Sequence, residues 1–431
     1  MNEDSKILML AYYYPPVNTV SVLRNHKISK EFSKHFSRVY LISSTNRYRL
    51  NTSEFDLPDI DIFDAFTFDY KTLLALGGNK KVNHPQTNKK SILATLFIKL
   101  SRSVPFTLII GEGGFFYIIH SFFIAQNLIR RHKIKYIYSS FGPMSDHFTA
   151  YLLKLFFTSI VWIADYRDLP VSTILNNVVF ENFQHRFNKF ILKKAQIVST
   201  VSTGLAMRLN VYKPDFYVLR NGIEKNILNF TRQPFSKFTM AYTGSMYGYE
   251  LINEFAHALY DLIQKNRINR NEIEVIYAGK DTAMWQTAMN NFVLNDIFIS
   301  KGIVSREISY DIQRNAHINL IFSATNEGND GIITTKFYEY LAAGNPIMVV
   351  INGDKKDEEF EEIMQDFNTD LVTYTSSAFE DISNFIFKNY QDKQKLGDVI
   401  RTNDIDKIQP YIWENRMQDF INRIKNTKPQ Q

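Results

Sequence analysis

The chain alternates short runs of β-branched and aromatic residues with longer segments in which apolar residues recur every three or four positions. Residues 6–14 and 38–44 have the pattern of buried strands, and residues 22–35 between them carry apolar side chains at helical spacing. Strands separated by helices indicate parallel βαβ units and a doubly wound sheet. The further strands predicted in the first half are residues 135–140, 160–166 and 196–202.

The same alternation starts again in the second half, with strands predicted at residues 237–245, 273–280, 297–303, 318–323 and 345–351. The pattern therefore predicts an α/β protein of two Rossmann-like, doubly wound parallel-sheet domains facing a central cleft. We place these domains at residues 1–225 and 226–405. A C-terminal helical segment, residues 406–431, is expected to pack back on the first domain. Ligands of open parallel sheets bind beyond the carboxyl ends of the strands, so we expect the functional residues there.

Composition narrows the chemistry that this fold can perform. The 431 residues include no cysteine, which excludes disulfides, thiolate metal ligands and a cysteine nucleophile. Acidic residues precede a short apolar run at the start of the chain, unlike a signal peptide, so a cytoplasmic location is expected. The net charge of +6 favours an anionic partner, such as a phosphorylated substrate or anionic lipid. Nucleic acid is not expected as a partner, because no zinc-finger, KH or RNP pattern is present.

The segment GIITTKFYEYLAAGNP, residues 331–346, carries the strongest candidate chemistry. Thr334 or Thr335 can cap a helix that ends at Gly344. Such a helix start offers free backbone N–H groups to a diphosphate, and Lys336 adds a full positive charge. Glu339, one turn later, accepts hydrogen bonds only and suits a pair of ribose hydroxyls. The alternative is an ordinary amphipathic helix with an exposed lysine–glutamate pair.

Residues 335–350, TKFYEYLAAGNPIMVV, resemble the donor-site segment of the retaining family 4 glycosyltransferases, which have the GT-B fold. Four further segments resemble that family in the same order along the chain: YYYPPVNTVSVLR (12–24), ADYRDLP (164–170), VLRNGIEKN (218–226) and AYTGSMYG (241–248). The resemblance implies that the first domain takes the acceptor and the second binds a nucleotide sugar. It also implies a metal-independent glycosyltransferase of hexosyltransferase type that needs no cofactor beyond its co-substrate. By the same resemblance, the expected acceptor is a glycan or a lipid-linked molecule in bacterial cell-surface polysaccharide biosynthesis.

The resemblance carries roles onto individual positions. Residues expected to bind the donor are Gly244, Ser245, Lys280, Gly302, Gly331, Thr334, Thr335, Lys336 and Glu339. Those expected to take part in catalysis are His147, Asp168 and Glu339, and those on the acceptor side are Asn18, Thr19, Arg24 and Arg167. The residues alone leave other roles open for three of them: a capping or solvated residue for His147, a pairing with aspartates for Arg167, and a surface ion pair for Arg24.

The chain departs from the family at three places. Gly331 stands where members often have a glutamate, and Gly244 and Ser245 stand where an arginine and a lysine commonly follow the first strand of the second domain. Asn18 and Thr19 replace a pair of glycines in the first loop. These changes leave Lys336 and Lys280 to neutralise phosphate, and they leave the donor sugar open.

Several rival functions follow from other patterns. Asp59-Ile60-Asp61 has the form of a metal-binding Asp-x-Asp, but it lies in an early segment that we interpret as surface, and no histidine spacing suits a metal. A nucleotide-sugar epimerase of the same fold would need paired acid–base carboxylates, and no distinctive pair is visible. A basic nucleic-acid-binding protein would need stacking aromatics along a groove. A dehydrogenase is disfavoured because no G-x-G-x-x-G follows the first strand.

Residues 104–129 are apolar enough to raise the question of a membrane. Glycines and Glu112 interrupt the stretch, so it is too short to span a bilayer. It predicts an amphipathic helix with one apolar face, formed by Phe115, Ile118, Ile119, Phe122 and Ile129. That face either packs on the first sheet or lies against lipid. Peripheral contact with an anionic membrane through residues 89–131 is favoured by the flanking Lys89, Lys90, Lys99, Arg102, Arg130 and Arg131.

Overall fold

The computed structural model divides into two compact units, Met1–Arg220 with Met417–Gln431, and Asn221–Arg416. The candidates Asn18, Thr19 and Gly331, and the flanking Lys89 and Lys90, lie outside the part of the chain that the structure describes. The described residues are 5–17, 20–48, 55–70, 72, 92–172, 177–229, 231–246, 251–324, 333–365, 367, 370–401 and 405–429.

The first unit is built on a seven-stranded parallel sheet in the order β3-β2-β1-β4-β5-β6-β7. Its strands are β1 (Lys6–Leu10), β2 (Arg38–Ser44), β3 (Asp61–Ala65), β4 (Tyr136–Ser140), β5 (Val161–Tyr166), β6 (Ile197–Thr200) and β7 (Tyr217–Val218). Every residue of β4, β5 and β6 is buried, as expected when helices cover both faces of a parallel sheet. The strand order reverses between β1 and β4, and such a switch point is where doubly wound sheets bind ligands.

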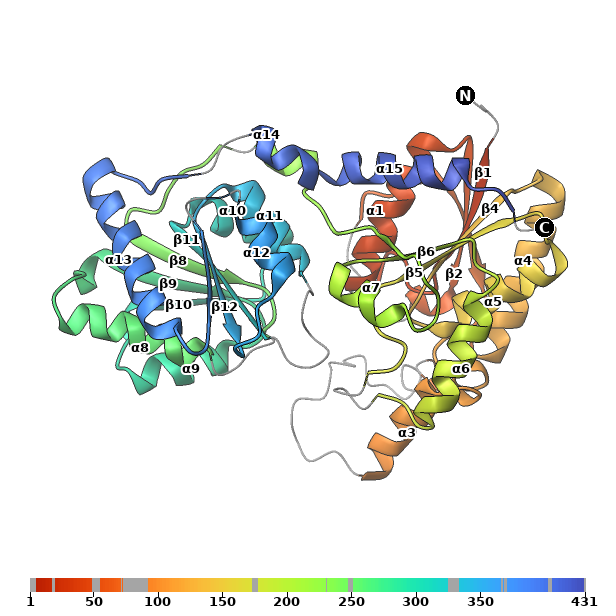
Figure 1. The fold of residues 1–431 in the computed structure, drawn as a ribbon, viewed down its shortest axis with the longest axis horizontal. Helices are drawn as coiled ribbons and strands as arrows, with labels where there is room; N and C mark the ends of the chain where they lie inside the picture. The colour runs from red at the N-terminus through yellow and green to blue at the C-terminus, as the bar shows by residue number, and fades with distance from the viewer. Residues whose placement is uncertain are drawn as a thin grey trace. The chain divides into compact units, whose positions relative to one another are not determined.

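Helices lie on both faces of this sheet (Figure 1). On one face α4, α5 and α6 pack beside one another, and α1 lies on the other. The helical elements of the chain up to Arg220 are α1 (Val20–His35), η1 (Thr45–Tyr48), α3 (Ile92–Arg102), η2 (Phe106–Leu108), α4 (Phe115–His132), α5 (Met144–Phe156), α6 (Glu181–Leu192) and α7 (Thr203–Leu209). The core between α4–α6 and the sheet includes Tyr117, Leu153 and Trp162.

The second unit repeats the design with a six-stranded parallel sheet in the order β10-β9-β8-β11-β12-β13. Its strands are β8 (Phe238–Thr243), β9 (Ile273–Ala278), β10 (Phe298–Gly302), β11 (Ile318–Ala324), β12 (Ile347–Asn352) and β13 (Leu371–Tyr374). The order reverses between β8 and β11, so the segments after these two strands flank the second switch point.

Two helical layers enclose this second sheet, with α8, α9 and α13 on one face and α10, α11 and α12 on the other (Figure 1). The helical elements from residue 221 onward are η3 (Lys225–Asn229), α8 (Leu251–Gln264), η4 (Arg270–Glu272), α9 (Thr282–Asn291), η5 (Asn295–Ile297), α10 (Arg306–Asn315), α11 (Thr335–Ala343), α12 (Glu358–Met364), α13 (Ala378–Leu396), α14 (Ile405–Ile408), η6 (Gln409–Tyr411) and α15 (Trp413–Asn426).

The last helix, α15, belongs largely to the first unit although it ends the chain. Phe420 stacks on Tyr217 of β7 with ring centroids 5.1 Å apart, and the Lys425 Nζ donates to the carbonyl of His35 at 2.6 Å. Met417, Phe420, Ile421 and Ile424 are buried, which is the spacing of one helical face.

The two-sheet α/β architecture confirms the predicted fold class, and each predicted strand is present with ends that differ by up to four residues. Three strands, β3, β7 and β13, were not predicted. In β3 only Ala65 is fully buried, and β7 spans two residues, so neither gives a hydrophobic run. The Asp59-Ile60-Asp61 sequence therefore leads into edge strand β3, where Arg38 holds the Asp61 carboxylate through two hydrogen bonds of 2.6 Å.

Candidate functional site

A glycine turn follows β8 at the switch point of the second sheet. Gly244 has a φ of +103°, which a residue with a side chain rarely adopts, and its N–H donates to the Ala278 carbonyl at 2.7 Å. A Cβ on Gly244 would lie 3.5 Å from the Lys336 Nζ, so the turn and this lysine face each other closely. Gly279 at the end of β9 fits tightly beside the turn, because a Cβ there would lie 2.3 Å from the Gly244 carbonyl oxygen.

Lys336, in the first turn of α11, points back to this turn. Its Nζ donates to the Tyr242 hydroxyl at 2.5 Å and to the Ser245 carbonyl at 3.2 Å, and it lies 4.0 Å from the centre of the Tyr242 ring. Burial lowers the pKa of Lys336 to about 7, although Glu339 and Asp281 act to raise it. Lys336 forms no ion pair with Glu339 or another carboxylate within the described residues. It is thus a partly buried cation whose hydrogen-bond partners are neutral.

The start of α11 also carries a buried hydroxyl without a hydrogen-bond partner among the described residues. Thr334 occupies the N-cap position with an extended backbone, but its side chain makes no capping hydrogen bond. The Thr334 Oγ1 is buried and lacks a hydrogen-bond partner in the described part of the chain. The helix then runs from Thr335 to Ala343 and ends at Gly344, as predicted. Free N–H groups, an unpaired hydroxyl and the Lys336 ammonium therefore gather at one helix start, a combination suited to an anion.

Glu339 lies one turn further along α11, in a polar cluster rather than against Lys336. Its Oε2 accepts from the Gln313 Nε2 at 3.1 Å, and the Arg306 guanidinium lies 3.8 Å from its Oε1. Gln313 also donates to the Thr243 hydroxyl at 2.8 Å, which connects the cluster to the end of β8. Arg306 is held in turn by Glu224 at 2.6 Å. The exposed lysine–glutamate pair of the alternative interpretation is not what the structure shows.

The other predicted donor residues occupy different surroundings. Ser245 lies in the glycine turn, and its carbonyl accepts from both Lys336 and Tyr242. Lys280 is exposed after β9, whereas its neighbour Asp281 turns inward and accepts from the Met246 N–H at 3.0 Å. Gly302 ends edge strand β10 with a φ of +62°, in open space. The structure thus brings Gly244, Ser245, Thr334 and Lys336 together and gives Lys280 no contact with them.

In the first unit, Arg24 and Asp165 form a buried ion pair that links α1 to β5. Two hydrogen bonds of 2.9 Å join the guanidinium to the carboxylate, and the side chains are 5% and 0% exposed. Burial alone would raise the pKa of Asp165, but Arg24 and a hydrogen bond from Ser199 hold it below its usual value. A third guanidinium nitrogen donates to the Leu219 carbonyl at 3.1 Å. Arg24 is therefore neither a surface residue nor open to a ligand in this structure.

His147 lies in the first turn of α5 and is directed into the interior. Its side chain is fully buried, and its Nδ1 is 2.8 Å from the Ser139 hydroxyl, which also accepts from the Trp162 indole. The Tyr166 ring packs edge-on at 4.7 Å. Burial lowers the pKa of His147 to about 3, so the imidazole is neutral. Its Nε2 has no hydrogen-bond partner among the described residues. The catalytic role expected for His147 stays a prediction, and the structure places its side chain among the ends of β4 and β5.

Arg167 and Asp168, which follow β5, differ sharply in their surroundings. The Arg167 guanidinium donates to the carbonyls of Phe141 and Gly142 at 2.7 and 3.1 Å, so it fixes the turn after β4 and does not pair with the aspartates. Asp168 is exposed beyond the carboxyl end of the strand. Of the two, Asp168 is the one whose side chain is available to a ligand.

The sequence interpretation missed the polar residues that hold these groups in place. Tyr242 contacts Lys336 and Gln313 contacts Glu339, and in the first unit buried Asp146 accepts from the Tyr12 N–H and the Tyr117 hydroxyl at 2.8 and 2.6 Å. Burial raises the pKa of Asp146 to about 7. The sequence did contain a signal for Tyr242 and Gln313. Tyr242 lies near the end of a predicted strand and Gln313 lies between two predicted strands, and buried polar atoms need hydrogen-bond partners. Within the described residues no cluster of His, Asp or Glu side chains has the arrangement of a metal site.

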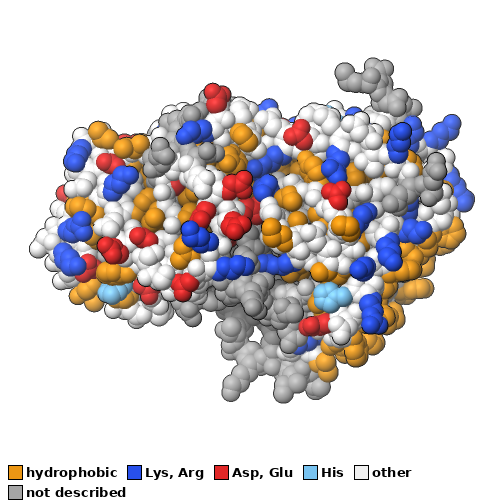
Figure 2. Space-filling view, viewed as in Figure 1, with side chains coloured by type: hydrophobic (Ala, Val, Ile, Leu, Met, Phe, Trp, Pro, Cys, Tyr) orange, Lys and Arg blue, Asp and Glu red, His pale blue; other side chains and the backbone are white. Residues whose placement is uncertain are grey.

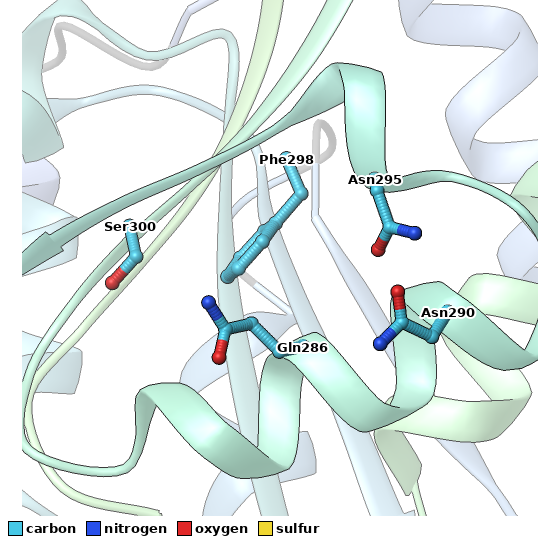
Figure 3. A pocket seen from close by; sticks show the side chains of 5 residues that line it. All are labelled: Gln286, Asn290, Asn295, Phe298 and Ser300. Atoms are coloured by element: carbon cyan, nitrogen blue, oxygen red, sulfur yellow. The ribbon is translucent and has the colours of Figure 1, made fainter.

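A separate pocket of about 590 Å³ lies between α9 and β10 (Figure 3). Gln286 and Asn290 extend from α9, Asn295 comes from η5, and Phe298 and Ser300 come from β10. Its lining offers amides, a hydroxyl and an aromatic ring but no charged side chain. The pocket lining thus offers no counter-charge to an anion, unlike the start of α11.

No family model matches the sequence, and no curated protein matches it. Solved structures do match over nearly the whole chain. They include a glycosyltransferase from Rickettsia africae (14% identity, 98% of each chain, TM-score 0.60) and a sucrose-phosphate synthase from Thermosynechococcus elongatus (13% identity, 98% of each chain, TM-score 0.62). The lipopolysaccharide outer core galactosyltransferase WaaB matches with 12% identity over 97% of this chain and 99% of its own, at a TM-score of 0.58. A protein from Listeria monocytogenes described as a UDP-N-acetylglucosamine 2-epimerase matches with a TM-score of 0.50.

These similarities define the fold. The chain has the GT-B fold, two Rossmann-like domains, in agreement with the sequence prediction. At identities of 14% and below, the choice among the activities that this fold supports depends on the residues of the site.

Proposed function

We propose that this protein is a glycosyltransferase that moves a sugar from a nucleotide-sugar donor to a glycan or lipid-linked acceptor, with retention of the anomeric configuration. The observation that supports it most is Lys336, a partly buried cation beside the Gly244 turn whose hydrogen-bond partners are neutral. Holding such a charge away from water is unfavourable unless an anion completes the site. The unsatisfied Thr334 hydroxyl at the same helix start supports an anion with several acceptor oxygens, such as a diphosphate.

In the proposed reaction, the bond between the anomeric carbon and the diphosphate oxygen breaks while an acceptor hydroxyl attacks from the same face. The hydroxyl proton passes to the departing diphosphate oxygen, so no protein nucleophile is required. Lys336 and the N–H groups at the start of α11 stabilise the negative charge that develops on the diphosphate. Glu339, positioned by Gln313, accepts hydrogen bonds from the ribose hydroxyls of the nucleotide. Gly302, Ser245 and Thr335 contribute backbone contacts, and exposed Lys280 contributes long-range charge.

On the acceptor side we propose that Asp168 orients the incoming hydroxyl, since it is exposed at the end of β5. We propose that Arg167 and His147 position the turn after β4, since Arg167 donates to the Phe141 carbonyl and the His147 ring packs beside the Phe141 ring. Cell-surface polysaccharide assembly is the setting we propose for the acceptor. The resemblance to family 4 members and the fold shared with a lipopolysaccharide galactosyltransferase support this choice.

Incubation with a panel of UDP-, GDP- and ADP-sugars tests the proposal. A glycosyltransferase should slowly hydrolyse its own donor and release the free nucleoside diphosphate. The rival epimerase would return an isomerised nucleotide sugar with no lasting loss of the intact donor. Epimerisation needs paired acid–base carboxylates. The two carboxylates that raise the pKa of Lys336 are Glu339 and Asp281, and Asp281 already accepts a hydrogen bond from the Met246 N–H. Stable accumulation of an isomer would therefore contradict the proposal.

We predict that donor hydrolysis continues unchanged in excess EDTA, because the proposed site neutralises the diphosphate with Lys336 and a helix start. The measurement is nucleotide release with and without EDTA, after dialysis against the chelator. Loss of the activity in EDTA and its recovery on addition of manganese would contradict the metal-independent mechanism.

Binding of the donor should take up a proton above neutral pH. Burial lowers the pKa of Lys336 to about 7, so the free protein loses this charge as the pH rises past 7. A bound diphosphate stabilises the ammonium form and raises the pKa again. Affinity for UDP or GDP should therefore fall above pH 7, by at most about tenfold per pH unit.

Calorimetric titrations at pH 8 in two buffers with different ionisation enthalpies measure this uptake. The matched control is Lys336→Arg, which keeps a permanent charge and should bind with no uptake at this position. Equal proton uptake by the wild-type protein and by Lys336→Arg would show that another group titrates.

A further inference from the structure

An extended set of large hydrophobic side chains is exposed on the first unit around the start of α4. We name it the aromatic face, and each member is between 40% and 68% exposed. Its members are Phe66, Phe68, Ile109, Ile110, Phe115, Phe116, Ile119, Phe123 and Phe156. In the view of Figure 2, hydrophobic side chains gather along the lower right edge, over the region of α4, α5 and α6, with lysines and arginines beside them.

The members of this face touch one another. The Phe116 ring lies 5.9 Å from that of Phe66, 6.2 Å from that of Phe68 and 5.8 Å from that of Phe115. Half-buried Phe122 contacts Phe123 at 5.7 Å and Phe156 at 5.6 Å. The Phe115 N–H donates to the Ile109 carbonyl at 3.2 Å, which places the loop after η2 beside the start of α4. Exposed Phe116, Ile119 and Phe123 follow one another at three- and four-residue spacing on α4, so they share one side of the helix and join the two groups of rings into one surface.

The size of this surface exceeds what a monomeric protein commonly exposes. A fully buried aromatic side chain hides about 200 Å², so nine large side chains near half exposure present on the order of 800 Å². The largest apolar patch of an ordinary monomer is roughly 300–600 Å² and is commonly functional. A partner is therefore expected to cover the aromatic face.

The structure corrects the predicted orientation of α4. Ile118 and Ile129, predicted to share one apolar face with Phe115 and Ile119, are buried together with Tyr117 and Leu128. Phe115 and Ile119 are instead exposed with Phe116 and Phe123. The helix is apolar on two sides, one packing on the sheet and the other left uncovered. None of the helices that the structure describes is long and apolar enough to pass through a bilayer.

Basic residues border the aromatic face on two sides. At one border lies exposed Arg102 of α3, whose charge acts to lower the pKa of Tyr70. The Tyr70 N–H donates to the Ile110 carbonyl at 3.4 Å. At the other, Arg130 of α4 lies 5.8 Å from the centre of the Phe157 ring. Arg131, Lys133 and Lys135 continue this second border and are exposed. The acidic residues nearby are exposed Asp64 on β3 and Glu112, whose carboxylate accepts from the hydroxyls of Tyr13 and Tyr70.

We propose that the aromatic face docks the protein on the surface of an anionic lipid membrane. Its phenylalanines would insert among the acyl-chain boundary while the bordering arginines and lysines meet the headgroups. A second copy of this chain fits less well, because a two-fold contact through this face would bring the same basic borders together. The proposal does not rest on sugar transfer, since membrane binding is measured without any substrate.

Flotation with vesicles tests the proposal on the full-length protein. The protein should float with phosphatidylcholine vesicles that contain phosphatidylglycerol at low salt. Flotation should fall at about 1 M salt, where charges act over only about 3 Å. The variant Phe116→Ser/Phe123→Ser should bind at least tenfold more weakly, while Leu396→Ser, an equally exposed leucine at the end of α13, should bind normally. Arg130→Glu/Arg131→Glu should lose at least fivefold for each charge removed.

Insertion itself can be observed with a fluorescent reporter. All three native tryptophans, Trp162, Trp285 and Trp413, are buried, so vesicles should leave their emission unchanged. The variant Phe123→Trp adds a fourth on the aromatic face. Its emission should shift to shorter wavelength with anionic vesicles and should be quenched by brominated lipids, and Leu396→Trp should show neither effect.

Two results would overturn the proposal. One is an absence of flotation with anionic vesicles at low salt by folded wild-type protein. The other is lipid-independent self-association, seen by analytical ultracentrifugation and abolished by Phe116→Ser/Phe123→Ser, which would assign the aromatic face to a protein partner.

Discussion

Replacing Lys336 with methionine should weaken binding of the donor nucleotide by about 10- to 150-fold, the loss expected for a charge-assisted hydrogen bond of roughly 1.5–3 kcal/mol. The rate of donor hydrolysis at saturating donor should also fall, by a factor on the order of 100, because charge on the departing diphosphate grows in the transition state. Isothermal titration with the nucleoside diphosphate and assays of nucleotide release measure the two effects separately.

The same substitution should make the free protein more stable. Burial lowers the pKa of Lys336 in the folded state to about 7, so the unfolded chain binds the proton more tightly between pH 7 and 10. Holding the charge in the folded state is therefore unfavourable at and below pH 7, and methionine removes that cost. The advantage of the variant in the free energy of unfolding should be largest near neutral and lower pH and should vanish as the pH approaches 10. A variant that loses both binding and stability would point to a structural role.

Lys280→Met supplies the matched control, because it removes the same charge from the other lysine that the sequence singles out. Lys280 is exposed and has no contact with the Gly244 turn, so its loss should change binding by no more than about threefold, as for a screened surface charge. If the two lysines had equal effects on donor affinity, the helix start would not be the diphosphate site.

Replacing Arg24 with methionine should have the largest effect on stability. It leaves the fully buried Asp165 carboxylate without its counter-charge, and breaking a buried ion pair costs about 3–5 kcal/mol. For a domain of this size, each kcal/mol moves the midpoint by about 2–4 °C, so the first unit should melt roughly 6–20 °C lower. Scanning calorimetry that resolves the transitions of the two units measures the shift.

Arg38→Met is the control for this prediction. Arg38 also makes a bidentate pair, with Asp61, but that pair is exposed to solvent and should contribute little. Its loss should leave the melting transition nearly unchanged. The double variant Arg24→Met/Asp165→Asn should be less destabilised than the sum of the two single variants, because the unpaired charge is gone. An unchanged midpoint in Arg24→Met would mean that the pair contributes little to folding.

Most of the fold could be predicted from the sequence, because strands and helices are visible in local patterns of apolar and polar residues. Buried parallel strands such as β12 contain continuous apolar runs, and Gly344 followed by Pro346 marks the end of α11. Strand β3 was not predicted because it is short, has aspartates (Asp61 and Asp64) at two of its five positions and lies at an edge of the sheet. Local pattern could not show which polar residues meet, since Arg24 and Asp165 are 141 positions apart.

The candidate site could likewise be predicted only as far as local sequence determines it. Lys336 and Glu339 could be chosen from their positions at a helix start, but their different neighbours come from β8 and α10. His147 has the position of a ligand-facing residue in sequence, yet Ser139, Trp162 and Tyr166 enclose it from strands β4 and β5. Side-chain direction in that helix depends on packing that no short motif encodes.

The attachment of α15 to the first unit imposes an order on biosynthesis. Residues 1–220 leave the ribosome first, but the buried stripe of Met417, Phe420, Ile421 and Ile424 arrives only after all of Asn221–Arg416. At roughly 5–20 residues per second, that interval lasts about ten to forty seconds. During this time the nascent first unit lacks the stacking partner of Tyr217 and keeps part of its core open. The domain that is translated first is thus completed last, and a stop codon shortly before residue 417 would release a chain with its second unit complete and its first unit unfinished.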